Sequence, residues 1–166
     1  MTPTEQFIQT LGGLKLGDLG RLRQCAGLPL HNSVAGFDLF SGLWWPLRQR
    51  SQRAPRREVA WLVAKLHAFR AIPQSAENNL PAILGAFARA EDRAAAGRRR
   101  SFDRLLTTPL SQIEPALQRA LAIVGQAVDN GRTAGLDWAR LTDDLSVWER
   151  EATRLKWAKQ YLGLEP

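Results

Sequence analysis

The sequence of 166 residues predicts an all-α protein, a helical bundle with two lobes and a long C-terminal helix. Apolar residues recur at spacings of three and four along most of the chain. Helix start and stop signals bound these stretches, and no stretch alternates apolar and polar residues as a strand would. At this length the chain forms one domain, or two small lobes that share a core. We expect the lobes to comprise residues 1–95 and 96–166, in one compact unit overall.

Two short helices are predicted at the start of the chain. Residues 2–5, Thr-Pro-Thr-Glu, supply a threonine cap, a proline at the first helical position and a glutamate three residues after the cap. Gly12 ends this helix, and Asp18 is a candidate cap for the second one. Residues 28–47 are apolar, and we expect them to be irregular, because a residue before a proline, as Trp45 is, is biased away from helix.

Three helices are predicted in the middle of the chain, after a basic linker at residues 48–57. The first is closed by Pro73, and its expected inward residues are Val59, Leu62, Val63, Leu66 and Phe69. The second begins at the cap Asn79. A joint of small residues at 94–97 separates it from a short helix over residues 98–106.

Two further helices complete the prediction. Ser111 and Glu114 resemble a capping box, while Pro115 fits better if Glu114 itself lies near the cap. Residues 129–131, Asp-Asn-Gly, end this helix. The last helix starts at the cap Asp137 and is expected to be one long, unbroken element. Its inward stripe is Trp138, Leu141, Leu145, Trp148, Ala152, Leu155 and Leu162.

Arginine dominates the charge of the chain. Of 23 basic residues, 19 are arginine and 4 are lysine, and the formal net charge is +7. The planar guanidinium donates two parallel hydrogen bonds to phosphate and stacks on bases, so this excess favours a polyanionic partner. The clusters are Arg21 and Arg23, then Arg48, Arg50, Arg53, Arg56 and Arg57, then Arg98, Arg99, Arg100 and Arg104.

Like-charge spacing supports the same interpretation. Four arginine pairs lie four residues apart, namely Arg53/Arg57, Arg89/Arg93, Arg100/Arg104 and Arg150/Arg154. On a helix each such pair is destabilising by about 0.2–0.5 kcal/mol, which indicates selection by something outside the chain. The alternative is a solvated face, in which arginine is common only because the coding sequence is rich in G and C. For the cluster from Arg98 to Arg104, phosphate contact is the favoured interpretation.

The sequence predicts no catalytic or metal site and no cofactor. His31 and His67 are the only histidines, and neither has a histidine or cysteine within one helical turn. Cys25, the single cysteine, is expected in the core, as is much of His67. The adjacent carboxylates at 91–92 and 143–144 point about 100° apart on a helix, so they form no facing acid–base pair. We expect the first pair at the surface, with contacts to another helix as an alternative for the second.

Trp44 and Trp45 form an apolar patch near Phe40 and next to Arg48 and Arg50. It could dock a protein, stack on bases or anchor to a membrane surface. No stretch approaches the roughly 18 apolar residues of a membrane helix, and no signal peptide is visible. With a single cysteine, these features predict a soluble, cytoplasmic protein.

The C-terminal segment resembles the signature of the CasB family, the small subunits of the type I-E CRISPR surveillance complex Cascade. The similar residues are 136–145 (Leu-Asp-Trp-Ala-Arg-Leu-Thr-Asp-Asp-Leu), Trp148, Arg154, Trp157, Ala158 and Tyr161. Three upstream segments add to a resemblance that covers most of residues 14–162. They are Leu22-Arg23 after Gly17-Asp18, Asn78-Asn79-Leu80, and Arg98-Arg99-Arg100 followed by Phe102, Arg104, Leu105 and Leu106.

The resemblance implies a two-lobed helical subunit, present in two copies, that stabilises an R-loop by holding DNA backbone without reading sequence. Its partners would be target DNA (either strand), the guide RNA complex and other Cascade subunits. Family positions that contact nucleic acid correspond by motif to Arg23, Arg56, Arg99 and Arg100, and then to Arg119 and Arg150. This chain departs from the family at Gln24, where a second arginine is usual, and at Asn78, where glycine is usual.

Together these observations predict a non-catalytic, sequence-independent nucleic-acid-binding subunit of a ribonucleoprotein in antiviral defence. The predicted nucleic-acid contacts are Arg21, Arg23, Arg56, Arg57, Arg99, Arg100, Arg104, Arg119 and Arg150. The predicted subunit-docking residues are Phe40, Trp44 and Trp45. Two alternatives stay open: a peripheral membrane or protein-docking helical protein, and a small helical enzyme with a cofactor pocket assembled in space.

Overall fold

The computed structural model describes residues 1–164, apart from the side chains of Ala35 and Asp92. Within this range there are nine α-helices and three short 3-10 helices, and the only strand-like feature is an isolated bridge between Gln74 and Leu136. The all-α prediction is therefore confirmed. The α-helices are α1 (Pro3–Gly12), α2 (Leu16–Gln24), α3 (Val34–Arg50), α4 (Arg57–Phe69), α5 (Leu80–Ala90), α6 (Ala95–Thr107), α7 (Glu114–Asp129), α8 (Trp138–Ser146) and α9 (Glu151–Tyr161). The 3-10 helices are η1 (Leu30–Asn32), η2 (Asp92–Ala94) and η3 (Leu110–Gln112).

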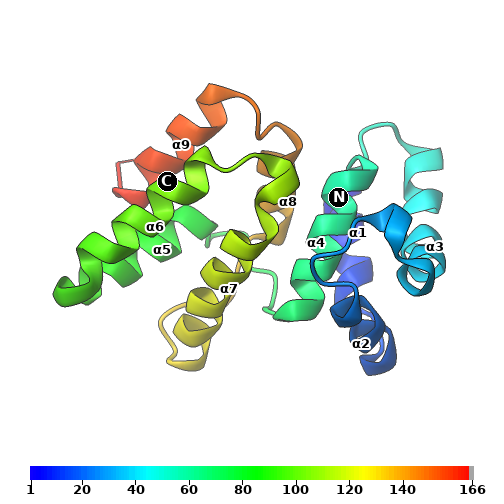
Figure 1. Ribbon diagram of the computed structural model, residues 1–166, viewed down its shortest axis with the longest axis horizontal. Helices are drawn as coiled ribbons and strands as arrows, with labels where there is room; N and C mark the ends of the chain where they lie inside the picture. The colour runs from blue at the N-terminus through cyan, green and yellow to red at the C-terminus, as the bar shows by residue number, and fades with distance from the viewer. Residues whose placement is uncertain (165–166) are drawn as a thin grey trace.

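The helices form two groups that share a core. Figure 1 shows α1–α4 on one side of the molecule, α5, α6 and α9 on the other, and α7 and α8 between them. α5 packs on α6, α7 and α9, and α2 packs on α4. α4 also contacts α7 and α8, and α1 contacts α8, so these helices join the groups. One cluster of buried apolar side chains runs through both groups. The predicted lobe boundary at residue 95 stays a prediction.

Three helix starts follow the predicted side-chain caps. At α1, Thr2 and Glu5 form a capping box, in which the backbone N–H of Glu5 donates to Thr2 Oγ1 over 3.1 Å. Asn79 Oδ1 accepts from the backbone of Ala82 at 2.9 Å and begins α5. Asp137 Oδ1 accepts from the backbone of Arg140 at 3.0 Å and begins α8. Each cap satisfies an N–H group that has no partner within its helix.

The apolar segment at 28–47 is mostly helical, which corrects the prediction of irregular structure. α3 begins after Ser33, whose Oγ accepts from the backbone of Gly36 at 3.1 Å, and it continues through Pro46. A proline inside a helix removes one hydrogen bond, here to the carbonyl of Gly42. Both residues are exposed, so water can satisfy this carbonyl, while Leu47 is buried on another side of the helix.

Two other predicted starts are corrected. α2 begins at Leu16, and Asp18 lies in its first turn instead of capping it. α6 begins at Ala95, so most of the predicted small-residue joint is the first turn of this helix. Both observed starts lie only a few residues from the predicted ones. Neither helix has a side-chain cap, so the sequence contains no local signal that marks its first residue.

The start of α7 settles the open choice between Ser111 and Glu114. Ser111 lies in η3, and α7 begins at Glu114 with Pro115 in its first turn. No side chain caps this helix, because its N-cap residue, Ile113, is apolar, and the carboxylate of Glu114 bonds to other parts of the chain.

The predicted long C-terminal helix is two helices, α8 and α9, with a break at residues 147–150. Asp144 near the end of α8 accepts hydrogen bonds from Lys156 and from Trp157 Nε1 of α9, the latter at 2.8 Å. Trp148, within the break, is buried and donates through Nε1 to the carbonyl of Thr108 at 2.9 Å. These long-range bonds fold α9 back, which a local spacing pattern cannot report.

The break also moves residues of the predicted stripe outward. Leu155 and Leu162 are exposed, and so is Ala152. Phe69, the last residue of α4, is likewise exposed rather than inward. Trp138, Leu141 and Leu145 of α8 are buried as predicted, and so is Trp148 in the break.

Helices α5 and α9 approach closely at Gly85. A Cβ atom at this position would lie 1.9 Å from the carbonyl oxygen of Tyr161, so only glycine allows the contact. Arg89, one turn later, donates to the same carbonyl at 2.8 Å. The contact fixes the C-terminal end of α9, and with it the ring of Tyr161, next to α6.

Candidate nucleic-acid interface

Two of the arginines on α6 already have carboxylate partners. Arg98 donates through Nη2 to Glu91 at 2.9 Å, and its guanidinium carbon lies 4.3 Å from the centroid of the Phe87 ring. Arg99 donates through Nε to Asp103 at 3.0 Å, one turn along the same helix. Their charges are partly neutralised within the fold.

The other two arginines of α6 face solvent. Arg100 and Arg104 are exposed, and neither forms an ion pair with any residue that the structure describes. Phe102 and Leu105 of the same helix are buried, and their packing holds α6 in place. Arg100 and Arg104 lie on the side of the helix that faces solvent.

A groove of about 560 Å³ lies between α6 and α7 and is named here the α6–α7 groove. Three exposed arginines line it from three different elements: Arg93 from η2, Arg100 from α6 and Arg119 from α7. None of the three has an ion pair within the described part of the chain, and no described side chain lining the groove is acidic. The groove is therefore a concentrated site of positive charge that suits an anion.

Of these three arginines, Arg100 and Arg119 were predicted contacts, and Arg93 was not. The spacing of Arg93 four residues after Arg89 was the signal that could have identified it.

An aromatic pair closes the groove on the side of α9. The rings of Phe102 and Tyr161 stack, with centroids 4.1 Å apart and planes 17° from parallel. The guanidinium of Arg99 lies 5.6 Å from the centroid of the Tyr161 ring. Burial raises the pKa of the Tyr161 hydroxyl, and the nearby charge of Arg99 opposes that shift. The hydroxyl is therefore protonated at neutral pH and can donate a hydrogen bond.

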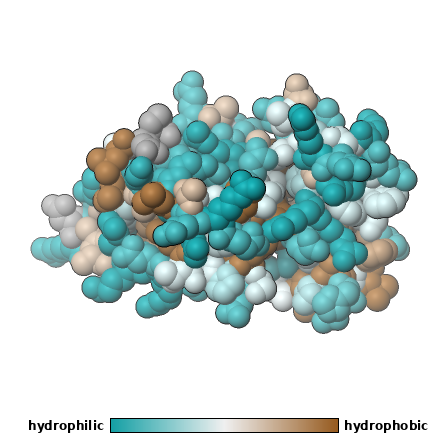
Figure 2. Space-filling view, turned by 90° about the horizontal axis from the view of Figure 1, so that it is seen from above, coloured by the Kyte–Doolittle hydropathy of each residue, from teal (hydrophilic) through white to brown (hydrophobic). Residues whose placement is uncertain are grey.

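A second groove, of about 1010 Å³, lies between the two groups of helices and is named the inter-group groove. Arg56, Arg57 and Arg154 line it, but so do Glu58, Glu114 and Glu149. Arg56 donates to Glu149 at 3.1 Å. Figure 2 shows the molecule from above, with long hydrophilic side chains over most of this face and hydrophobic ones exposed between them. Charges of both signs meet in the inter-group groove, which weakens its attraction for an anion.

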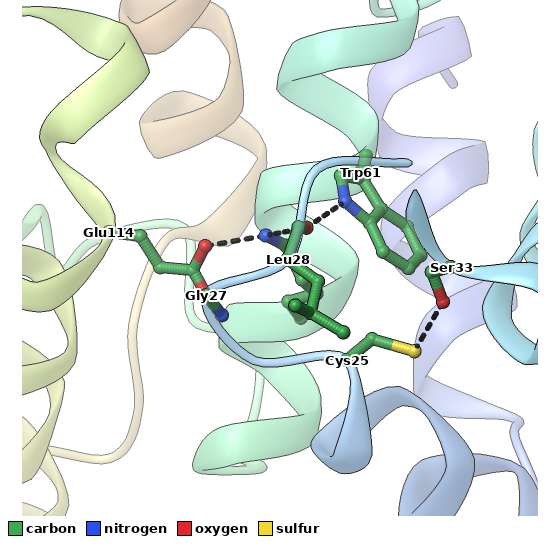
Figure 3. Close-up of polar contacts among 7 residues, drawn as sticks. Cys25, Gly27, Leu28, Ser33, Trp61 and Glu114 are labelled. Carbon is green, nitrogen blue, oxygen red and sulfur yellow. Dashed lines mark hydrogen bonds and ion pairs between the residues drawn. The ribbon is translucent and has the colours of Figure 1, made fainter. Parts of the chain in front are cut away.

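A buried ion pair lies at the base of the inter-group groove. Lys65, whose side chain is 5% exposed, pairs with Glu114 and also donates to the carbonyl of Leu28 at 3.0 Å. Glu114 accepts from the backbone of Gly27 at 2.8 Å, and Trp61 Nε1 donates to the same Leu28 carbonyl at 2.9 Å. Figure 3 shows the segment with Gly27 and Leu28 between Glu114 on one side and Trp61 on the other.

This ion pair joins α4, α7 and the connection between α2 and η1. Sequence reasoning missed it. The signal was a lysine within the buried, apolar run of α4, next to Ala64 and Leu66.

Five predicted contacts line neither groove: Arg99 and Arg104 of α6, described above, and three on other elements. Arg21 is exposed, 3.9 Å from Asp18. Arg23 donates through Nε to the carbonyl of Ala68 at 2.9 Å, so part of its guanidinium ties α2 to α4. Arg150 is exposed at the start of α9. The structure thus brings Arg100 and Arg119 together and places these three apart from them.

The expected docking patch is smaller than predicted. Phe40 is fully buried, stacked on Trp44 at 5.8 Å and edge-on to Trp61 at 5.4 Å, so it belongs to the core rather than to the surface. Trp44 is partly buried and donates through Nε1 to the carbonyl of Pro55 at 2.7 Å. Trp45 is 50% exposed and remains available at the surface.

The remaining titratable candidates have structural contacts. His67 is buried, with its ring edge-on to Trp138 at 5.3 Å, and burial lowers its pKa. Cys25 is buried, with its Sγ 3.0 Å from the Oγ of Ser33. Asp143 accepts from Thr4 Oγ1 at 2.8 Å, which ties α8 to α1.

Neither a metal cluster nor a membrane span is found where the chain is described. Across residues 1–164, with two side chains excepted, no group of three or more His, Cys, Asp or Glu residues could hold a metal ion. No helix in this range is both long enough and apolar enough to cross a bilayer.

Comparison with known proteins agrees with the resemblance seen in the sequence. No curated protein sequence matches the chain. A Cse2-family protein and a CasB structure, both from Thermus thermophilus, each match with a TM-score of 0.73 and 25% identity, over 98% of this chain and 99% of theirs. CasB from M. ruber has the same fold, with a TM-score of 0.75 and 20% identity over 98% of this chain and 94% of that one. The family model of CRISPR-associated protein Cse2 matches residues 18–162, so this chain belongs to the Cse2 family, also named CasB.

Proposed function

We propose that this protein is a non-catalytic subunit of a type I-E CRISPR Cascade ribonucleoprotein in the cytoplasm. It binds nucleic acid without reading sequence and stabilises the R-loop by holding DNA backbone through arginines. One observation carries the proposal: Arg93, Arg100 and Arg119 converge on the α6–α7 groove, and none of them has a carboxylate partner in the described part of the chain.

Arginines without partners suit backbone holding for an electrostatic reason. A guanidinium that is already paired must lose its carboxylate before it can bind a phosphate, whereas a free one exchanges only solvent and counterions. Phosphates are the same at every nucleotide, so contacts to them position a strand and carry no sequence information. In an R-loop, base pairing with the guide supplies sequence recognition, and protein contacts to backbone supply affinity.

Other exposed arginines lie outside the groove. Arg104 lies one turn after Arg100 on α6, and Arg150 immediately precedes α9. Arg21 and Arg57 are exposed on the N-terminal group. In the proposed complex, two copies of the subunit and other Cascade subunits place these arginines along one strand, with Trp45 and the partly buried Trp44 at a protein contact.

Fluorescence anisotropy tests this function. Labelled single- and double-stranded DNA of unrelated sequences are titrated with the protein over a series of salt concentrations. We expect similar affinities for unrelated sequences and a linear fall of log affinity with log salt concentration, whose slope estimates the number of phosphates contacted. Absence of binding at low salt overturns the proposal. A stronger, salt-sensitive preference for anionic vesicles selects the membrane-surface alternative.

A further inference from the structure

The α6–α7 groove has a property that phosphate holding does not require. Besides its exposed arginines, it is lined by apolar residues that are largely buried in the fold: Leu84, Leu105, Ala120 and Ile123. A surface that touches only phosphates can be flat. A hollow with an apolar lining instead suits a ligand with an apolar ring or chain as well as a charge.

Two polar groups of residues lining this groove are buried and unsatisfied. The hydroxyl of Tyr161 and the Nε of Arg98 have no hydrogen-bond partner within the described structure. Tyr161 as a residue is only 5% exposed. Buried polar groups in native proteins nearly always have partners, so these two groups beside one hollow are candidates to bond a ligand there.

The size and the charge of the groove restrict the ligand. Its volume of about 560 Å³ is that of a site for a small organic molecule. Arg93, Arg100 and Arg119, which have no ion pair within the described residues, suit a phosphate or a similar anion. The apolar lining and the two unsatisfied polar groups call for a flat group with hydrogen-bonding edges.

We propose that the α6–α7 groove binds one unstacked nucleotide, with its base inside the groove and its phosphates on Arg93, Arg100 and Arg119. The Tyr161 hydroxyl and Arg98 Nε then bond to the edge of the base. The proposal rests on the proposed function, because the nucleotide belongs to the strand whose backbone the arginines hold. The same chemistry would accept a free mononucleotide, which the test separates from a strand.

This arrangement is compatible with binding that ignores sequence. A hydroxyl group both donates and accepts, and every base has an acceptor for a donor such as Arg98 Nε. The groove therefore requires a base but does not select which one. A base inside a duplex is stacked and paired, so the groove favours a single strand over a duplex of the same length.

The test compares an intact single strand with an abasic strand of the same length and charge. Both have the same phosphates, so backbone holding alone gives them equal affinity. A base in the groove makes the intact strand bind about tenfold more tightly, and this ratio should persist at high salt, where the phosphate contribution is weak.

Two variants locate the effect. Tyr161→Phe removes only the hydroxyl, so we expect affinity for the intact strand to fall about three- to tenfold and affinity for the abasic strand to stay unchanged. Its melting temperature should stay equal or rise, because an unsatisfied group is lost. Ala96→Phe places a ring in the groove from an exposed position on α6 and should abolish the preference for the intact strand. The matched control is Ala122→Phe, at an exposed position of α7 that does not line the groove.

The outcomes separate this inference from the proposed function. Equal, salt-dependent binding of intact and abasic strands overturns the nucleotide site and leaves backbone holding standing. If neither strand binds, the proposed function fails. Calorimetry with a deoxynucleoside monophosphate then tests whether the groove binds a free nucleotide. If the monophosphate binds and Ala96→Phe abolishes this binding, the ligand of the groove is a free nucleotide. If the monophosphate does not bind, the proposed nucleotide site is overturned.

Discussion

The two grooves contain the same cationic residue in different electrostatic settings. In the α6–α7 groove, Arg100 and Arg119 have no acidic neighbour among the described lining residues. In the inter-group groove, Arg56 is paired with Glu149, and Glu58 lines the same surface. The difference shows that counting arginines does not locate an anion site. What matters is whether the fold also brings carboxylates to the same place.

A second difference concerns burial. The inter-group groove has Lys65 and Glu114 at its base, and both hold the chain together rather than face a ligand. The cations of the α6–α7 groove are exposed on helices whose apolar faces are already packed. We therefore expect charge changes at the buried Lys65–Glu114 pair to affect stability, and those in the α6–α7 groove to affect binding.

The largest effect is expected for Lys65→Met. The substitution leaves the carboxylate of Glu114 buried without its cation, which typically costs about 3–5 kcal/mol of unfolding free energy. Urea denaturation followed by tryptophan fluorescence measures this loss. The double variant Lys65→Met/Glu114→Gln serves as the control, because it removes both charges and should recover part of the stability. A loss below about 1 kcal/mol for the single variant would contradict a structural role for the pair.

The second largest effect is expected for the double variant Arg100→Glu/Arg119→Glu. Loss of two phosphate contacts and reversal of their charge should lower affinity for single-stranded DNA about 100-fold at low salt and reduce the salt slope by about 1.4. Unfolding free energy should change little, because both side chains are exposed and free of ion pairs in the described structure.

The matched control changes net charge by the same amount in the other groove. Arg56→Glu/Arg57→Glu should lower affinity about tenfold or less, through the general field of the protein. Equal losses for the two double variants would mean that affinity follows net charge and not the place of the arginines.

Local signals in the sequence predicted the helix starts, and long-range contacts account for what they missed. Thr2, Asn79 and Asp137 cap helices through atoms three residues away, so the sequence contains the whole interaction. The break between α8 and α9 depends instead on bonds from Asp144 to Lys156 and Trp157, which lie more than three turns further along. A pattern of spacing cannot report such bonds.

One part of the candidate site could likewise be predicted from the sequence, and the other part depends on tertiary packing. The arginine excess and the cluster on α6 were visible in the sequence, and they led to Arg100. The convergence of Arg93 and Arg119 with it needs the packing of α6 and α7 on α5, which joins segments that are distant in the sequence. The burial of Phe40 was missed because its partner Trp61 comes from a different helix.

The third effect is a dependence of stability on pH at His67. Burial lowers its pKa below the usual 6.5, against a hydrogen bond to the carbonyl of Leu11 that raises it. Well above pH 6.5 the histidine is neutral in both states; as the pH falls through 6.5, the unfolded chain takes up a proton before the folded chain does. Unfolding free energy should therefore fall between pH 6.5 and the lower pKa of the folded state, by at most about 1.4 kcal/mol per pH unit.

His67→Gln should remove this slope, which chemical denaturation at about pH 7.5 and 5.5 would measure. DNA affinity of the native protein should not change over the same range, because arginine stays protonated. An unchanged slope in the variant would assign the pH dependence to other groups.

The smallest effect is expected when the inter-group groove is made to resemble the α6–α7 groove. Glu58→Gln/Glu149→Gln removes two exposed carboxylates that line it and releases Arg56 from its ion pair. Exposed ion pairs contribute about 0–1 kcal/mol, so stability should hardly change. Affinity for single-stranded DNA should rise about two- to fivefold with a steeper salt slope, because Arg56 and Arg57 become available to phosphate. Anisotropy across the salt series measures both. Unaltered affinity would mean that the inter-group groove lies off the path of the strand, and that the carboxylates do not mask a second site.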